Sequence, residues 1–162
     1  MSDTDPKDLT ATIMKDTRIV TLTYVDDHGR LVSTPMGNQD FEDPSTVWFI
    51  TELDTDKVAA IRQRPEVNVA YASDDGWVSL AGRAVISTDR AKLEELWDLS
   101  VSAWMKGDAK DPNNGLIEVR ADTAEYWESP GKVALAVDLV KGLVTKDKAQ
   151  DEDDDSSGVV QL

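Results

Sequence analysis

Alternating apolar and polar residues divide much of the chain into short extended segments. Residues 18–25 (RIVTLTYV) and 31–36 (LVSTPM) alternate on either side of the turn sequence DDHGR, which is typical of a β-hairpin. Residues 67–73 (VNVAYAS) and 77–87 (WVSLAGRAVIS) repeat this arrangement around DDG, so a second hairpin is predicted there.

Further strands and several helices complete the pattern. The strands are predicted at 46–51 and 116–128, and the helices at 6–16, 57–64, 89–104 and 133–144. The helix over 89–104 has the strongest pattern, because apolar residues recur at helical spacing from Leu93 to Val101, after Thr88 or Asp89 as N-cap. Pro65 ends the helix at 57–64.

These segments predict a mainly β protein, a six-stranded antiparallel barrel with flanking helices. The hairpins favour this fold over a doubly wound parallel sheet, whose parallel strands need long crossover connections. A small closed barrel fills its interior with side chains. A ligand would therefore lie on the outside of the barrel, at its mouth, or between two copies.

Composition narrows the classes of function. The 162 residues suggest one domain with a core of its own, and the lack of cysteine excludes disulfides and thiolate metal sites and fits a reducing cytoplasm. No signal-peptide pattern and no apolar run of membrane-spanning length is visible, so we expect a cytoplasmic protein. The formal net charge of −15 repels phosphate backbones and anionic lipids, so neither nucleic acid nor a membrane is an expected partner.

Acidic residues are concentrated near the C-terminus. Residues 146–157 (KDKAQDEDDDSS) contain one apolar residue, which indicates a solvated, disordered segment. We therefore expect one domain over residues 1–145 and an acidic tail over 146–162. The acids from Asp151 to Asp155 are contiguous, unlike the interrupted ligands of a calcium loop. The final GVVQL is apolar again, and the sequence leaves open whether it docks as a short strand or frays.

Five stretches of the sequence, in this order and spacing, resemble one known family. They are RIVTLTYVDDHGRLVSTPM, VWFITELDTDKVAAIRQRPEVNVAYA, WVSLAGRAVISTDRAKLEELW, AWMKGD and EVRADTAEYWESPG. Over about residues 9–144 the chain is similar to the general stress protein 26 branch of the pyridoxamine 5′-phosphate oxidase-like flavin-binding split barrels. The resemblance implies a homodimer that binds FMN, or another flavin such as FAD or a deazaflavin, between its subunits.

The resemblance also implies which residues hold the flavin. They are Ser33, Thr34, Pro35 and Met36 near the ribityl phosphate, Phe49, Ile50 and Thr51 along the isoalloxazine ring, Thr55, Asp56 and Lys57 around the phosphate, and Trp104 and Trp127 at the subunit interface. Trp104 would come from the partner subunit. A lysine at the head of a helix, beside free backbone N–H groups, is in any case the simplest anion site that a chain can build.

The chain departs from the family pattern in the cations around the phosphate. Many relatives carry arginine where this chain has Thr34, and Ser-Arg where it has Thr55-Asp56. A charge-assisted hydrogen bond contributes about 1.5–3 kcal/mol, so losing two weakens phosphate binding unless Arg62, Arg64, Arg83 or backbone N–H groups compensate. The sequence leaves open whether the phosphate site binds weakly or has lost its function.

The resemblance implies a flavin-dependent oxidoreductase that passes electrons or hydride from a reduced nicotinamide to a small oxidant. A flavin carries the redox chemistry itself, so few catalytic side chains are needed. Two alternatives stay open: a stress protein that only binds or buffers a flavin-like ligand, and a split barrel that has lost its cofactor. Synthesis of pyridoxal phosphate is not expected, because the substrate-binding arginine-histidine motif of the true oxidases is absent.

Other chemistries find little support in the sequence. His28 is the only histidine and lies in a hairpin turn, so neither a catalytic triad nor a catalytic zinc is expected. No dinucleotide-binding or P-loop glycine motif is present. Trp48, Trp77 and Trp97 fall on strand or helix patterns, where an aromatic residue usually packs in the core, and we assign them to packing.

Overall fold

The computed structural model describes residues 5–130 and 157–162. Its helices are α1 (Pro6–Asp16), α2 (Asp56–Gln63), α3 (Arg90–Leu96) and α4 (Leu99–Trp104). Its strands are β1 (Ile19–Val25), β2 (Leu31–Gly37), β3 (Thr46–Glu52), β4 (Glu66–Ser73), β5 (Gly76–Ser87), β6 (Asn114–Glu128) and β7 (Ser157–Gln161). The predicted mainly β architecture is confirmed. The helix predicted at 133–144 lies outside the described residues.

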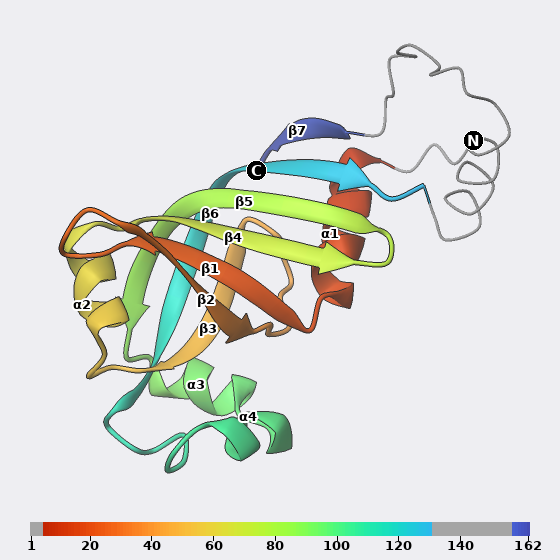
Figure 1. Ribbon diagram of the computed structural model, residues 1–162. Helices are drawn as coiled ribbons and strands as arrows, with labels where there is room; N and C mark the ends of the chain where they lie inside the picture. The colour runs from red at the N-terminus through yellow and green to blue at the C-terminus, as the bar shows by residue number, and fades with distance from the viewer. Residues whose placement is uncertain (1–4, 131–156) are drawn as a thin grey trace, which may run out of the picture.

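The strands form one antiparallel sheet that curls into a barrel (Figure 1). Neighbouring strands follow the order β2-β1-β4-β5-β6-β3, and β7 pairs with the second half of β6. A bulge opposite Ala81 and Gly82 divides β6, so its first half pairs with β3 and its second half with β7. Within the described residues no ladder joins β2 to β3, and the barrel is split along this seam.

The sheet has seven strands, so the prediction of six is wrong. The additional strand, β7, comes from the apolar C-terminal residues. Val160 is buried and Leu162 packs against the barrel core. Gly158 lies opposite Tyr126, whose ring occupies the space that a side chain at position 158 would need. The tail predicted over 146–162 therefore ends in a docked strand.

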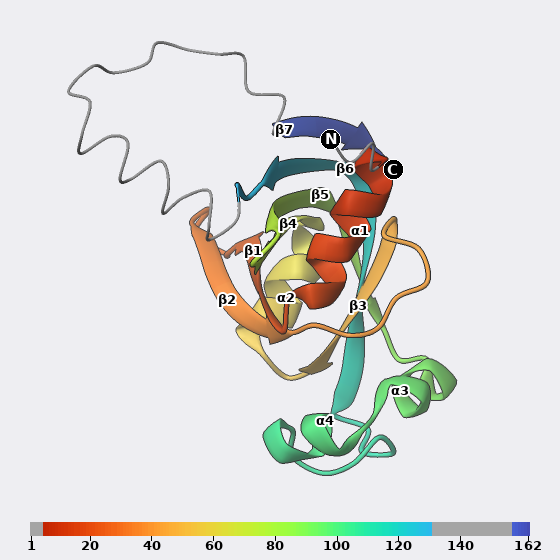
Figure 2. The same cartoon turned by 90° about the vertical axis from the view of Figure 1, so that its right-hand side faces the viewer.

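Two helices close opposite ends of the barrel, with α1 in front and α2 behind in Figure 2. Helix α1 begins after Asp5, whose carboxylate accepts a hydrogen bond from the N–H of Lys7, and it buries Ile13 and Met14 in the barrel core. Helix α2 buries Ile61 in the same core. Because both helices contribute apolar side chains, the barrel interior is filled from its walls and from its two ends.

A break divides the segment predicted as one helix over 89–104, so that prediction is wrong. Helix α3 is capped by Asp89, which is one of the two predicted N-caps, but the helix ends at Leu96. Helix α4 starts after Asp98, whose carboxylate accepts a hydrogen bond from the N–H of Val101 at 2.9 Å. An aspartate that caps the backbone in this way competes with a continuous helix. The two helices cover the outer side of β3 and β6 through one apolar cluster: Ile50, Leu93, Leu96, Val101 and Leu116.

The tryptophans assigned to packing divide between two environments. Trp48 and Trp97 pack against the cluster beneath α3 and α4, as predicted. The prediction for Trp77 is wrong, since it is 48% exposed on the outer side of β5. Alternation along a strand shows which residues share a face, but it does not show which face is buried. Within residues 5–130 and 157–162, no helix combines the length and apolar character needed to cross a bilayer.

Tyr71 is the largest side chain buried in the barrel core, and its hydroxyl has no hydrogen-bond partner among the described residues. Burial raises the pKa of this phenol, so the hydroxyl stays protonated. A buried polar group left unpaired costs about 1–3 kcal/mol. We therefore expect Tyr71→Phe to raise the free energy of unfolding by about 1 kcal/mol, measured by chemical denaturation. A less stable variant would show that the hydroxyl forms a hydrogen bond in solution.

Candidate functional site

The start of α2 combines a capped helix end with a lysine, and we refer to Thr55, Asp56 and Lys57 as the α2 corner. The hydroxyl of Thr55 accepts a hydrogen bond from the N–H of Val58 at 3.4 Å and donates to the carbonyl of Glu52 at 3.2 Å. The N–H groups of Asp56 and Lys57 belong to the first helical turn, where no intrahelical acceptor exists. Together with the positive end of the helix dipole, they favour an anion at this corner.

Lys57 forms no ion pair with the acids that the structure describes. Its side chain is half-buried, and its ammonium nitrogen lies 3.3 Å from the sulfur of Met36 near the end of β2. The ion pairs found among the described residues do not include Lys57. Burial lowers the pKa of Lys57, and the charge of Glu52 partly opposes this effect. A thioether is only a weak acceptor, so the ammonium keeps most of its capacity to bind an anion.

Asn113 braces the turn that leads into the α2 corner. The N–H of Leu53 donates to the carbonyl of Asn113 at 2.7 Å, and the N–H of Asp54 donates to the side-chain oxygen of Asn113 at 3.2 Å. The side-chain amide of Asn113 donates in return to the carboxylate of Asp54 at 3.0 Å. The position of the corner therefore depends on the loop that precedes β6.

Arg90 and Asn114 hold that loop in place. The guanidinium of Arg90 donates to the carbonyls of Asp111 at 3.0 Å and Asn114 at 2.7 Å. The side chain of Asn114 is buried and donates to the carbonyls of Lys106 at 2.8 Å and Asp108 at 2.9 Å. A guanidinium suits this role because it presents several donors in a fixed plane. The connection from α4 to β6 is thus held by these hydrogen bonds, and Met105 and Ala109 also pack against the cluster beneath α3 and α4.

Asn113→Ala is expected to loosen the α2 corner while the barrel stays folded. The variant loses two side-chain hydrogen bonds of about 0.5–1.5 kcal/mol each, so the free energy of unfolding should fall by about 1–2 kcal/mol. Backbone amides of residues 53–57 should exchange with solvent faster, as measured by hydrogen–deuterium exchange. Lys110→Ala, an exposed change in the same loop, is the control and should alter neither quantity. Unchanged exchange in Asn113→Ala would show that the turn holds its own shape.

The predicted site residues of β2 point to two different faces. Ser33 and Pro35 point outward, whereas Thr34 and Met36 point inward, and Met36 reaches the barrel core. Side chains of adjacent residues on a strand cannot contact one ligand from the same side. The inward pair therefore lies on the side of Lys57, and the outward pair belongs to the outer surface of the sheet.

The predicted site residues of β3 are largely covered by the protein itself. Phe49 is fully buried in the barrel core, and Ile50 packs beneath α3 and α4. Thr51 is buried as well, and its hydroxyl donates to the carbonyl of Glu52 at 3.2 Å. Since β3 pairs with β6 on one side only among the described strands, its backbone groups toward the β2 seam are the ones left for a ligand.

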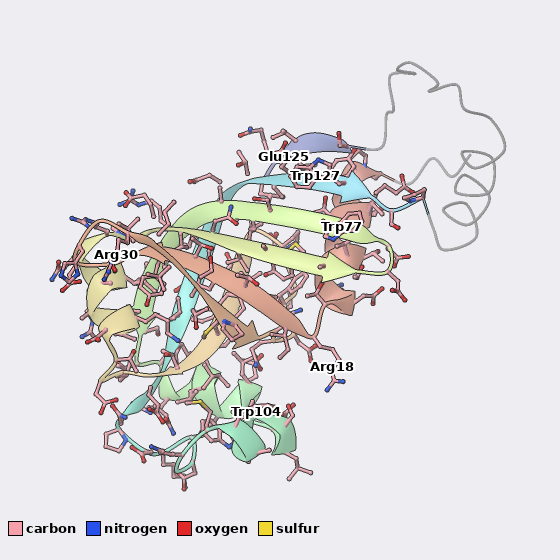
Figure 3. All side chains as sticks on the ribbon, in the orientation of Figure 1. Arg18, Arg30, Trp77, Trp104, Glu125 and Trp127 are labelled. Atoms are coloured by element: carbon pink, nitrogen blue, oxygen red, sulfur yellow. The ribbon has the colours of Figure 1, made fainter. Side chains whose placement is uncertain are left out.

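Trp104 and Trp127 lie at opposite ends of the molecule (Figure 3). Trp104 ends α4 and is 86% exposed. Trp127 is 38% exposed on β6, directly opposite Trp77 on β5. A single chain therefore does not bring the two predicted tryptophans to one site.

Two surface hollows and an acidic turn lie apart from the predicted site. The hollows measure about 650 and 560 Å³, and none of the predicted site residues lines either of them. At the acidic turn, ligand atoms of Asp26, Asp27 and His28 come within 4.8 Å of one another. Asp26 there accepts hydrogen bonds from the N–H groups of His28 and Arg30, and the bond from Arg30 is the main reason that its pKa is lowered. The arrangement stabilises the hairpin turn, and the His28 side chain is exposed.

A comparison with protein families settles the relationship that the sequence suggested. The model of the family described as pyridoxamine 5′-phosphate oxidase like matches residues 5–151. The chain belongs to this family. Among curated relatives, the protein bli-3 of Neurospora crassa is 28% identical over 111 residues, which cover 60% of this chain. The chain spans about half of that relative, 52% of its length.

Solved structures show the same fold. General stress protein 26 from Bacillus anthracis is similar with a TM-score of 0.66 and 25% identity, over 74% of this chain and 92% of that one. A pyridoxamine 5′-phosphate oxidase-related, FMN-binding protein from Nostoc punctiforme gives a TM-score of 0.62 at 19% identity, over 82% and 89% of the two chains. The expected split-barrel fold and the resemblance to the general stress protein 26 branch are confirmed.

The residues that brace the α2 corner were not predicted from the sequence. Asn113 and Arg90 contact their partners across long stretches of the chain. A loop sequence such as KGDAKDPNNG shows that polar groups are available, but it does not indicate which carbonyls they bind. The local signals for this site were Lys57 at the head of the predicted helix and the capping pattern of Thr55 before it.

Proposed function

We propose that this chain is an FMN-binding split-barrel protein that holds the flavin phosphate at the α2 corner. The observation that carries the proposal is Lys57, a half-buried cation without an ion-pair partner among the described residues, placed at the head of a helix. The N. punctiforme relative supports the choice of ligand, because it is an FMN-binding protein by its description.

The residues of the corner fit a phosphate group. Lys57 supplies a positive charge, Thr55 a hydroxyl, and the first turn of α2 supplies N–H donors. The backbone edge of β3 toward the β2 seam would meet the polar edge of the ring system, because the side chains of Phe49 and Ile50 are occupied by packing. In this proposal the inward residues Thr34 and Met36 line the approach to Lys57.

In the proposed function the chain is a cytoplasmic oxidoreductase that works as a homodimer. Bound FMN supplies hydride and single-electron transfer, while the protein binds, orients and shields it. A reduced nicotinamide is the proposed electron donor and a small oxidant the acceptor. In a homodimer, Trp104 of one subunit would reach the site of the other, which agrees with its exposed position at the end of α4.

One observation favours the alternative of a weak or lapsed site. Arg64 donates to the carbonyl of Asp26 at 2.6 Å, and Arg83 pairs with Glu66 at 2.7 Å on the outer side of the sheet. Neither arginine therefore replaces the cations that relatives carry at the positions of Thr34 and Asp56. Asp56 also adds a negative charge to the corner itself.

Titration with FMN and with riboflavin tests the proposal, because riboflavin has the same ring system and no phosphate. We expect the protein to quench FMN fluorescence on binding and to bind riboflavin at least tenfold more weakly, which corresponds to one charge-assisted contact of about 1.4 kcal/mol. Equal affinity for the two would refute the phosphate site. If FMN binds, bleaching of its visible absorbance by NADH or NADPH separates an oxidoreductase from a protein that only stores the flavin.

A further inference from the structure

The smaller of the two surface hollows, of about 560 Å³, has walls from several elements. It lies between the connection from β2 to β3 and helices α3 and α4, which Figure 2 shows below that connection. We call it the α3 hollow, and the residues that define it are 38–43, Trp48, Lys92, Glu95 and Asp98. Its volume is in the range of small-molecule sites. No residue implied for the flavin lines it, so a ligand of the α3 hollow would be a separate ligand.

Carboxylates dominate the charge of the α3 hollow. Among the described residues, five acids line it against one base, Lys92. The acids are Asp40, Glu42, Asp43, Glu95 and Asp98. Charges of one sign around a hollow add their potentials, so the α3 hollow attracts cations and repels phosphates and carboxylates.

Two of these carboxylates are held in place and kept charged. The carboxylate of Asp43 accepts a hydrogen bond from the N–H of Ser45 at 2.8 Å, and that of Asp98 accepts one from the N–H of Val101 at 2.9 Å. These hydrogen bonds are the main reason that the pKa of both acids is lowered. Since Asp43 belongs to the connection and Asp98 caps α4, both walls of the α3 hollow carry a fixed negative charge.

The α3 hollow already binds one ammonium group, which belongs to the chain itself. The ammonium nitrogen of Lys92 lies 5.5 Å from the centroid of the Trp48 ring and 3.1 Å from the carboxylate of Glu95. Aromatic faces attract the ammonium groups of ligands as well as those of lysines. The ion pairs found among the described residues include none of the other four acids, so these carboxylates are left for a further cation.

Asn38, also in the wall of the α3 hollow, has an acceptor that lacks a partner. Its side-chain nitrogen donates to the carbonyls of Met14 and Thr17, both at 2.7 Å. Its side-chain oxygen is buried and has no hydrogen-bond partner among the described residues. A buried acceptor left unpaired is costly, and a ligand with N–H groups would supply the missing donor.

The carboxylates of the α3 hollow do not converge on one point, as a metal ion requires. Within residues 5–130 and 157–162, the group of three metal-ligating side chains with ligand atoms inside 4.8 Å of one another is Asp26, Asp27 and His28, at the other hairpin turn. Separated negative charges suit a ligand whose positive charges are separated as well. The α3 hollow therefore favours an organic cation over a metal ion.

We propose that the α3 hollow binds a small organic cation with two or more ammonium groups, of the aliphatic polyamine class. One ammonium group would lie near the ring of Trp48 and the carboxylate of Glu95, and another would pair with the acids of residues 38–43. This binding does not depend on the flavin function proposed above, because the α2 corner does not line the α3 hollow.

Titration calorimetry with putrescine, a diamine, tests the proposal on the full chain without added flavin. Magnesium carries the same charge of two in a compact form, and we expect it to bind about tenfold more weakly than putrescine or worse at about 0.1 M salt. Chemical shifts of backbone amides should change on putrescine addition at residues 38–43 and 92–100. Magnesium that binds as tightly as putrescine would overturn the proposal, as would shifts spread over the whole acidic surface.

Asp43→Asn with Asp98→Asn removes one charge from each wall while both side chains can still accept their backbone hydrogen bonds. This double variant should bind putrescine about tenfold more weakly. Glu94→Gln with Glu125→Gln, at exposed positions outside the α3 hollow, removes the same charge and should leave the affinity unchanged. Equal losses in the two double variants would show that only the net charge of the protein attracts the diamine.

Trp48→Leu separates the contribution of the ring from that of the acids. Leucine can still pack against the apolar cluster beneath α3 and α4, but it has no aromatic face. Putrescine affinity should fall about two- to fivefold, the share of an exposed cation–π contact. Circular dichroism checks the fold of this variant, and the paired asparagine variant decides the proposal if Trp48→Leu does not fold. Unchanged affinity in folded Trp48→Leu would remove the ring from the site.

Discussion

Lys57→Ala is expected to weaken FMN binding about ten- to a hundredfold and to leave riboflavin binding unchanged. The variant removes the half-buried ammonium at the α2 corner, and a hydrogen bond to a charged group contributes about 1.5–3 kcal/mol. Isothermal titration calorimetry with the two ligands measures the difference. Among the residues that the structure describes, the ammonium has a hydrogen bond only to a thioether, so its removal should not reduce stability.

Two further variants show whether the effect of Lys57→Ala is specific to the phosphate site. Lys110→Ala removes one exposed positive charge outside the corner and should leave FMN affinity unchanged. Asp56→Asn removes the carboxylate of the corner and should strengthen FMN binding several-fold, since like charges at close range repel. Equal loss in Lys57→Ala and Lys110→Ala would mean that net charge, rather than a phosphate site, controls affinity.

The pH dependence of FMN binding should follow the charge of Lys57. The phosphate stays doubly charged above about pH 7, while burial lowers the pKa of Lys57 from its usual 10.5. The advantage of FMN over riboflavin should therefore shrink as the pH rises through this lowered pKa, and Lys57→Ala should show no such change.

For the stability of the free protein, the effect of rising pH has the opposite sign. The unfolded chain holds this proton more tightly, so the lysine is destabilising at neutral pH and the penalty fades as pH rises.

Gly76→Ala is expected to destabilise the fold by about 3 kcal/mol or more, a fall in melting temperature of about 6–12 °C for a chain of this size. Gly76 is the first residue of β5, directly after the turn from β4, and has a φ of +151°, a conformation that residues with side chains rarely adopt. A Cβ at this position would overlap the carbonyl oxygen of Trp127 on β6. Since that carbonyl belongs to a strand, the clash cannot be relieved by a side-chain rotation.

Gly29→Ala separates the cost of the backbone conformation from the cost of the clash. Gly29 also has a positive φ, of +77°, but nothing in the described structure lies within 4 Å of the Cβ that the change would add. It should cost only about 1 kcal/mol, the conformational part alone. Thermal denaturation of both variants gives the comparison. Similar losses in the two variants would show that β6 moves away from the added methyl group at little cost.

Most strands and helices of the barrel could be predicted from local signals in the sequence. The hairpins around DDHGR and DDG have turn residues and alternation that agree with each other, and helix α1 has Pro6 at its first turn after a capping aspartate. These signals arise from residues close together in the sequence. The order of the strands was not predicted, because periodicity does not show which strands pair when they lie far apart in the sequence.

The failures of prediction come from an overlooked helix cap and from packing that joins distant parts of the chain. The break at Asp98 was missed because apolar spacing runs on across it, and only the cap to Val101 shows that a new helix begins. Trp77 has the alternation of a core residue, but it lies on the outer side of β5, where it is exposed. At the site, Phe49 fits the family pattern of a ligand strand, and only tertiary packing shows that its ring belongs to the core.

Strand β7 gives the molecule a part that can open by itself. Its pairing joins Ser157 to Trp127 across a long stretch of chain, and it is anchored by Val160, Leu162 and the contact of Gly158 with Tyr126. An element with so few buried groups detaches at a much lower free energy than the whole fold. Detachment would turn the second half of β6 into a free edge that can pair with another chain. Slow aggregation of concentrated samples would then begin from molecules whose barrel is still intact.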